Sequence, residues 1–137
     1  MIIRILSLVV PIMCLAACSS LPVEDASFKQ LKHMADGGNV ESQLRMGEIY
    51  LKIEAKEGIP ESGPNAVKYL KMAAIQGNAK ATVYLGRIYE IWSFYTSSPD
   101  DPKMAAKWYR KGIELGDSNA RESLERLLDK HPELNEN

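Results

Sequence analysis

The sequence has little of what enzymes and metal proteins use at their sites. Its 137 residues include only two cysteines and two histidines. It has no Gly-rich phosphate loop, no paired-histidine metal motif and no nucleophile elbow. Lys and Arg number 17 and Asp and Glu 18, so no basic excess is present to hold nucleic acid. We therefore expect no enzyme activity, cofactor, metal, small-molecule substrate or nucleic-acid partner.

Long hydrophobic runs are also missing. Residues 5–15 are apolar but are broken by Pro11, and a membrane span needs about 20 such residues. With Arg4 just before it, this run predicts a signal peptide. Residues 15–18, Leu-Ala-Ala-Cys, close the run and resemble the bacterial lipobox. The resemblance implies that residues 1–17 are removed and that Cys18 carries a diacylglycerol. A secretory signal cut after Ala17, with Cys18 a free thiol, is the alternative.

The cysteine count favours the lipid. Cys14 is lost with the signal, and one spare thiol in an oxidising compartment would invite cross-linking. In Gram-negative lipoproteins an Asp after the cysteine is the usual inner-membrane retention signal, and here Ser19 follows. By that resemblance we expect a lipid anchor on the periplasmic face of the outer membrane. Residues 18–22 are the expected tether, and the four residues after Cys18 reach about 13 Å.

Three short stretches recur at an interval of 39 residues: 34–42, 73–81 and 112–120. Each contains a glycine followed by Asn or Asp, at positions 38–39, 77–78 and 116–117. A glycine just past a helix can take the left-handed conformation that ends it, and the next residue can cap a new helix. Each stretch therefore predicts a tight turn between two helices, and three at one period predict a helical repeat.

Apolar residues at helical spacing predict six helices, over residues 23–36, 39–53, 64–76, 78–91, 102–115 and 117–130. Asp101 is the expected cap of the fifth helix. The helical domain is expected over 23–131, with 132–137 as a C-terminal tail. Gly47 and Gly86 fall inside helices, where glycine costs about 1 kcal/mol relative to alanine. Their recurrence predicts that helices approach closely there.

Residues 42–50 and 81–89, with the pattern small-x-x-x-apolar-Gly-x-x-Tyr, resemble the first helix of the Sel-one-like repeat, a relative of the tetratricopeptide repeat. Residues 66–74 and 105–112 resemble its second helix. The resemblance implies an all-α fold, a short right-handed α-solenoid of about six antiparallel helices. The last copy departs from it, with Glu125 in place of the glycine and Leu128 in place of the tyrosine.

In this family the first helix of each pair commonly lines the concave side, which implies a partner-binding face. The positions that point away from the core stripe are Arg45, Glu48 and Lys52, then Tyr84, Arg87 and Ile91, then Ser123, Arg126 and Lys130. Tyr84 and Ile91 would be apolar groups on an exposed face beside Arg87, and aromatic residues and Arg are enriched at binding hot spots. A solvated face is the alternative.

The segment 92–95, Trp-Ser-Phe-Tyr, is the second candidate for binding, as part of a loop over 92–100. A loop folded back onto the core is its alternative, because Trp and Phe are seldom exposed.

Two functions remain open. One is a membrane-tethered lipoprotein that binds a protein partner as a scaffold or adaptor in the cell envelope. The other is a periplasmic immunity protein that neutralises an antibacterial toxin of the phospholipase type, because some Sel-one-like repeat proteins are encoded beside such toxins.

Overall fold

The computed structural model describes residues 26–58, 61–96 and 100–136. Within these ranges the chain forms six α-helices and a 3-10 helix, and no strand. The prediction of an all-α fold is confirmed for this part of the chain. None of its helices is both long and apolar enough to cross a membrane. The expected signal peptide, Cys18 and the tether lie outside the described residues.

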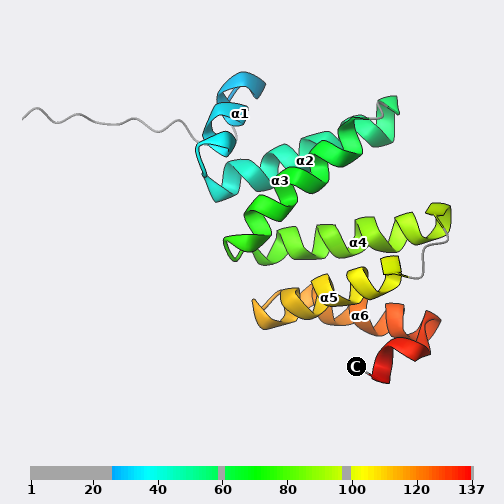
Figure 1. Ribbon diagram of the computed structural model, residues 1–137. Coiled ribbons are helices and arrows are strands. Elements are labelled where there is room, and N and C mark those ends of the chain that lie inside the picture. The colour runs from blue at the N-terminus through cyan, green and yellow to red at the C-terminus, as the bar shows by residue number, and fades with distance from the viewer. Residues whose placement is uncertain (1–25, 59–60, 97–99, 137) are drawn as a thin grey trace, which may run out of the picture.

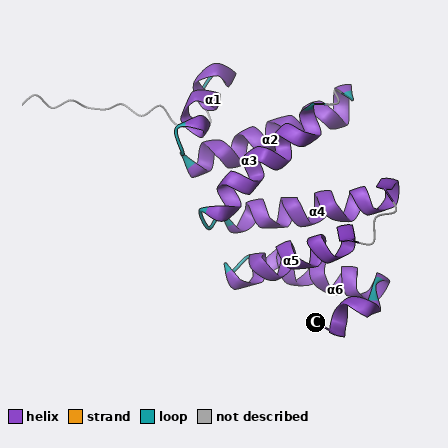
Figure 2. Ribbon diagram, viewed as in Figure 1, coloured by secondary structure: helices purple, strands orange, loops and turns teal. Residues whose placement is uncertain are grey.

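The helices follow one another along the molecule in chain order (Figure 1), and each packs against the next. Their bounds are α1 Phe28–Asp36, α2 Val40–Glu57, α3 Ser62–Ile75, α4 Ala79–Thr96, α5 Asp100–Glu114 and α6 Ser118–Lys130, and the 3-10 helix is Pro132–Glu136. Figure 2 shows the short turns that join α1 to α2, α3 to α4 and α5 to α6.

The three repeated turns have the geometry that the sequence predicts. A glycine takes a left-handed backbone in each, with φ of +96° at Gly38, +89° at Gly77 and +84° at Gly116. The side chain of the next residue then accepts a backbone N–H of the following helix. These caps join Asn39 to Ser42 at 2.8 Å, Asn78 to Ala81 at 2.9 Å and Asp117 to Asn119 at 2.8 Å. The prediction of helix–turn–helix at each site is confirmed.

Several helix ends differ from the prediction. Helix α1 begins at Phe28 and not at residue 23, because Ser27 forms a reciprocal capping box with Gln30. Helix α2 continues past residue 53 to Glu57, where Gly58 adopts a left-handed φ of +62° and ends it. Asp101 lies inside the first turn of α5 and is not its cap.

The end of α4 and the C-terminal residues also differ from the prediction. Helix α4 runs to Thr96, so the segment 92–95 is helical and not part of a loop. The expected tail contains the 3-10 helix, and Leu134 in it is buried against α5 and α6. Arg110 on α5 donates from Nη2 to the carbonyl oxygen of Leu134 at 3.0 Å. This end of the chain therefore covers the last helix pair.

The helix-interior glycines mark the tightest approaches between neighbouring helices. A Cβ at Gly47 on α2 would lie 2.6 Å from Cγ of Leu70 on α3. A Cβ at Gly86 on α4 would lie 2.6 Å from Cδ1 and 2.8 Å from Cζ of Tyr109 on α5. Real Cβ contacts are longer than this, so both sites require glycine for the observed packing. The predicted close approach is confirmed at both.

Candidate binding face

Glu48 on α2 joins that helix to α4, which is two helices further along the chain. Its carboxylate accepts a hydrogen bond from the Tyr84 hydroxyl at 3.0 Å. It also pairs with Lys80 Nζ at 2.8 Å and with Arg45 at 3.4 Å. The Glu48 side chain is only 13% exposed, whereas that of Lys80 is 59% exposed. The negative charge therefore lies beneath, and the positive charges lie at the surface.

The electrostatic environment keeps Glu48 ionised. Burial by itself would raise its pKa, but the hydrogen bonds from Lys80, Tyr84 and Arg45 outweigh burial, and the pKa lies below its usual value. Burial and the neighbouring Glu48 carboxylate together raise the pKa of the Tyr84 hydroxyl. The hydroxyl thus stays protonated and remains a donor to Glu48.

Glu90 makes the equivalent link between α4 and α6. It accepts from the Tyr109 hydroxyl at 2.9 Å and pairs with Lys130 at 3.2 Å and Arg126 at 3.5 Å. Its side chain is 11% exposed. Burial would raise its pKa, but Tyr109, Lys130 and Arg126 lower it further than burial raises it. Two buried carboxylates therefore tie α2, α4 and α6 together along one face, which we call the α2–α4–α6 face.

Of the nine positions predicted for the partner-binding face, the six of the first two copies line hollows on this face, and Ser123, Arg126 and Lys130 do not. A hollow of about 400 Å³ is lined by Arg45, Glu48 and Lys52 of α2 and by Tyr84 of α4. It shares Leu51 and Ala55 with a larger hollow of about 650 Å³, which contains Ile91. A small hollow of about 90 Å³ shares Tyr84 with the first and contains Arg87. These six residues, which the period of 39 residues relates to one another, thus lie on one continuous, uneven surface.

The exposure of these residues differs from the prediction at Glu48, Tyr84 and Ser123. Ile91 is 53% exposed, as expected for an apolar group on an open face. Tyr84 is half-buried, whereas the sequence predicted an exposed side chain. Its ring packs against the core of α2, α3 and α4, and its hydroxyl donates to Glu48. Tyr84 therefore has a structural role as well as a place on the surface. Ser123, the third-copy equivalent of Tyr84, is buried.

The second predicted candidate, segment 92–95, is the last part of α4. Trp92 is half-buried, packs edge-on against Tyr89 with ring centroids 5.6 Å apart, and lines the large hollow with Ile91. The side chains of residues 93–95 lie outside the described residues. Trp92 thus joins the α2–α4–α6 face and does not form a separate loop site.

The chain was compared with protein-family models, with curated proteins and with solved structures. None of them matches it. Inferences about the site therefore come from the residues themselves. Within the part of the chain that the structure describes, no group of His, Cys, Asp and Glu is arranged to hold a metal ion.

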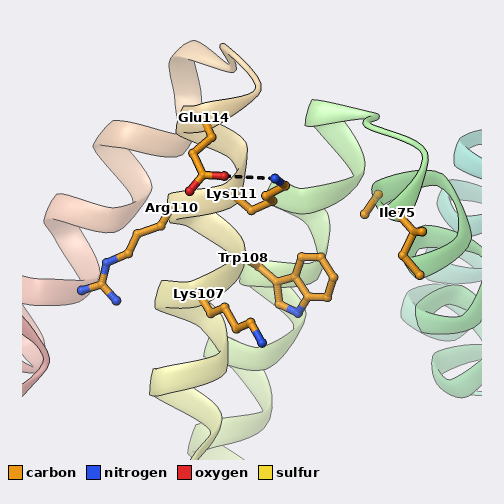
Figure 3. A pocket seen from close by; sticks show the side chains of 7 residues that line it. Ile75, Lys107, Trp108, Arg110, Lys111 and Glu114 are labelled. Carbon is orange, nitrogen blue, oxygen red and sulfur yellow. Dashed lines mark hydrogen bonds and ion pairs between the residues drawn. The ribbon is translucent and has the colours of Figure 1, made fainter. Parts of the chain in front are cut away.

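One hollow was not anticipated from the sequence. It lies between α3 and α5, has a volume of about 440 Å³ and shares no lining residue with the other three (Figure 3). Ile75, which is 81% exposed, faces it from α3, and Trp108 with Lys107 and Lys111 faces it from α5. The Trp108 indole nitrogen is buried and has no hydrogen-bond partner among the described residues. In the sequence, residues 105–112 only resembled the second helix of the repeat, and nothing there marked a cavity.

Proposed function

We propose that this chain is a lipid-anchored protein of the cell envelope whose α2–α4–α6 face binds a protein partner. The observation that carries the proposal is the position of Ile91. It is an apolar side chain left 53% exposed at a hollow of about 650 Å³, and it is flanked by charged residues of the same face. Exposed apolar groups rimmed by polar ones are typical of protein–protein contact sites.

The repeated packing supports a Sel-one-like solenoid as the scaffold of this face. Gly47 against Leu70 and Gly86 against Tyr109 are the same contact, 39 residues apart. The three capped turns follow the same interval. In repeat proteins of this kind each unit packs on the next, and the resulting extended surface binds partners. A right-handed stack of helix pairs is therefore the arrangement that we propose.

The anchor is proposed from the sequence of residues 1–18. Lipid on Cys18 would hold the domain near the outer membrane on its periplasmic side. The helical domain begins at Phe28, so residues 19–27 separate it from Cys18. At 3.3–3.6 Å per residue a fully extended segment of this length reaches at most about 32 Å. The face would still act close to the membrane.

Site-specific photo-crosslinking in the source cells tests the binding face. Benzoylphenylalanine replaces Ile91 in one variant and Ile75, the exposed residue beside the other hollow, in the matched control. We expect a covalent protein adduct from position 91 and none from position 75. No adduct at 91, or an equal one at 75, would refute the proposed face. The identity of the crosslinked protein separates an envelope adaptor from an immunity protein.

Metabolic labelling tests the anchor independently. Cells that express the chain are fed a labelled fatty acid, and the protein is isolated. We expect label on the native chain and none on Cys18→Ala, whereas Cys14→Ala should label normally because Cys14 is removed with the signal peptide. Label retained by Cys18→Ala would show that the lipid is attached elsewhere.

A further inference from the structure

The larger hollow of the α2–α4–α6 face, of about 650 Å³, is apolar except for one carboxylate. Its lining residues are Glu54, Leu51, Ala55, Gly63, Ile88, Ile91 and Trp92. Glu54 is the one charged residue among them. A volume of this size and a mainly apolar wall with few polar groups are usual for sites that enclose part of a ligand, and the polar groups fix which ligand is accepted. The carboxylate therefore decides the chemistry of the occupant.

The Glu54 carboxylate has no partner in the part of the chain that the structure describes. Its side chain is half-buried, and no hydrogen bond or ion pair joins it to another described residue. Its oxygens lie 2.7 and 2.8 Å from the position that a Cβ of Gly63 would occupy, so it rests against the first turn of α3. A helix start favours a negative charge nearby, but no N–H of that turn donates to Glu54. A half-buried charge without a partner is costly, and a cation in the hollow would remove that cost.

The cations of the same face lie elsewhere. Arg45 and Lys80 pair with Glu48 in the adjoining hollow of about 400 Å³, which Lys52 also lines. None of these three cations lines the hollow of Glu54. The sequence outside the described ranges contains no Lys or Arg apart from one arginine in the expected signal peptide. A cation that pairs with Glu54 would therefore come from another molecule.

We propose that an arginine or lysine side chain of the protein partner enters this hollow and pairs with Glu54. The long aliphatic stem of such a side chain packs on apolar walls while its head keeps its charge, which matches a hollow with Ile91 and Trp92 beside one carboxylate. This inference rests on the proposed function and specifies the group that the face binds. A purely apolar side chain is the weaker occupant, because it would cover Glu54 and leave it unpaired.

The test uses the full-length chain, purified from detergent-solubilised membranes and immobilised. The probe is a phage-displayed library of random peptides, and the best peptides are synthesised for affinity measurement. Glu54→Gln removes the charge and keeps the shape of the side chain. Glu57→Gln is the matched control, because Glu57 is an exposed carboxylate one turn further along α2 that does not line the hollow. Each peptide is also made with Met in place of its Arg or Lys, so that the coupling between the two groups can be measured.

We expect the enriched peptides to share an Arg or Lys beside apolar residues. Their affinity should fall about tenfold or more in Glu54→Gln and less than about twofold in Glu57→Gln. The Met peptides should bind the native chain and Glu54→Gln with about equal affinity, because they lack the group that pairs with the carboxylate. Enriched peptides without Arg or Lys, no enrichment, or equal loss in the two variants would overturn the proposal.

The stability of Glu54→Gln separates a binding role from a structural one. Because no described residue pairs with the carboxylate, its melting temperature should differ from that of the native chain by less than about 2 °C. A larger decrease would show that the charge serves the start of α3, and it would overturn the proposal. If position 91 still crosslinks a protein in cells while Glu54→Gln binds peptides normally, the proposed function stands and only the basic partner group fails.

Discussion

Replacing Gly86 by alanine should raise the stability of the protein if helix propensity dominates and lower it if packing against the neighbouring helix dominates. In an exposed helix interior the change would stabilise the helix by about 1 kcal/mol. At Gly86 the new methyl group would lie 2.6 Å from Cδ1 and 2.8 Å from Cζ of Tyr109. Ordinary carbon contacts begin near 3.4 Å, so the ring and the methyl must separate by most of an ångström.

Tyr109 cannot move cheaply. Its side chain is fully buried, and its hydroxyl donates to Glu90 at 2.9 Å. Overpacking of such a site costs typically 1–3 kcal/mol, and a rigid ring held at its far end favours the upper part of that range. After the gain from helix propensity, we expect Gly86→Ala to destabilise the protein by about 1–2 kcal/mol. The melting temperature should fall by roughly 4 °C or more.

The assay is thermal unfolding followed by circular dichroism, with Glu125→Ala as the control. Glu125 stands 39 residues after Gly86 on α6 and is exposed. That change should alter stability by less than about 0.5 kcal/mol. Combining Gly86→Ala with Tyr109→Leu should cost less than the sum of the two single changes, because the smaller side chain relieves the contact. A Gly86→Ala protein as stable as the native one would refute the packing argument.

Three further predictions concern stability. Glu48 and Glu90 have pKa values lowered in the folded state, so their contribution to the free energy of unfolding is complete above about pH 4.5 and is lost as pH falls through the folded pKa values. Glu48→Gln with Glu90→Gln should lower the melting temperature at pH 7 and should reduce the further decrease of the melting temperature in acid. If that decrease is as large in the variant as in the native protein, other groups cause the acid sensitivity. Asn78→Ala removes the cap of α4 and should cost about 1 kcal/mol in denaturant unfolding, and no change would mean that the cap is dispensable. Leu134→Ala should cost about 2 kcal/mol or more if the C-terminal 3-10 helix belongs to the core, and a cost near zero would show that it does not.

The periodic part of the fold was predictable because its signals are local. A glycine followed by Asn or Asp sets both a left-handed residue and a cap, so the turns at Gly38, Gly77 and Gly116 follow from adjacent residues alone. Helix ends outside this pattern were not predictable in the same way. Helix α1 begins at Phe28 because Ser27 and Gln30 form a capping box, a local signal that was missed. Helix α4 continues through Trp92, whose ring packs on Tyr89 and the core. The end of α4 therefore depends on a tertiary contact, whereas the start of α1 does not.

The sequence period predicted which residues share the α2–α4–α6 face, but it did not predict the contacts among them. The interval of 39 residues related Tyr84, Arg87 and Ile91 to Arg45, Glu48 and Lys52, and all six line hollows there. Sequence could not indicate that Tyr84 would bond to Glu48, because the two residues are 36 apart and belong to different helix pairs. Nor could it indicate the hollow beside Trp108, since a cavity depends on what neighbouring helices leave unfilled. Contacts between residues of different repeats cannot be predicted from the sequence of one repeat.

The buried carboxylates also bear on how the molecule can deform. Glu48 and Glu90 join helices that are not consecutive, on the α2–α4–α6 face. Opening that side would lengthen the bonds from Tyr84 to Glu48 and from Arg126 to Glu90, whereas closing it would not. The two links therefore act as tethers of fixed maximum length, and they limit flexing in one direction only.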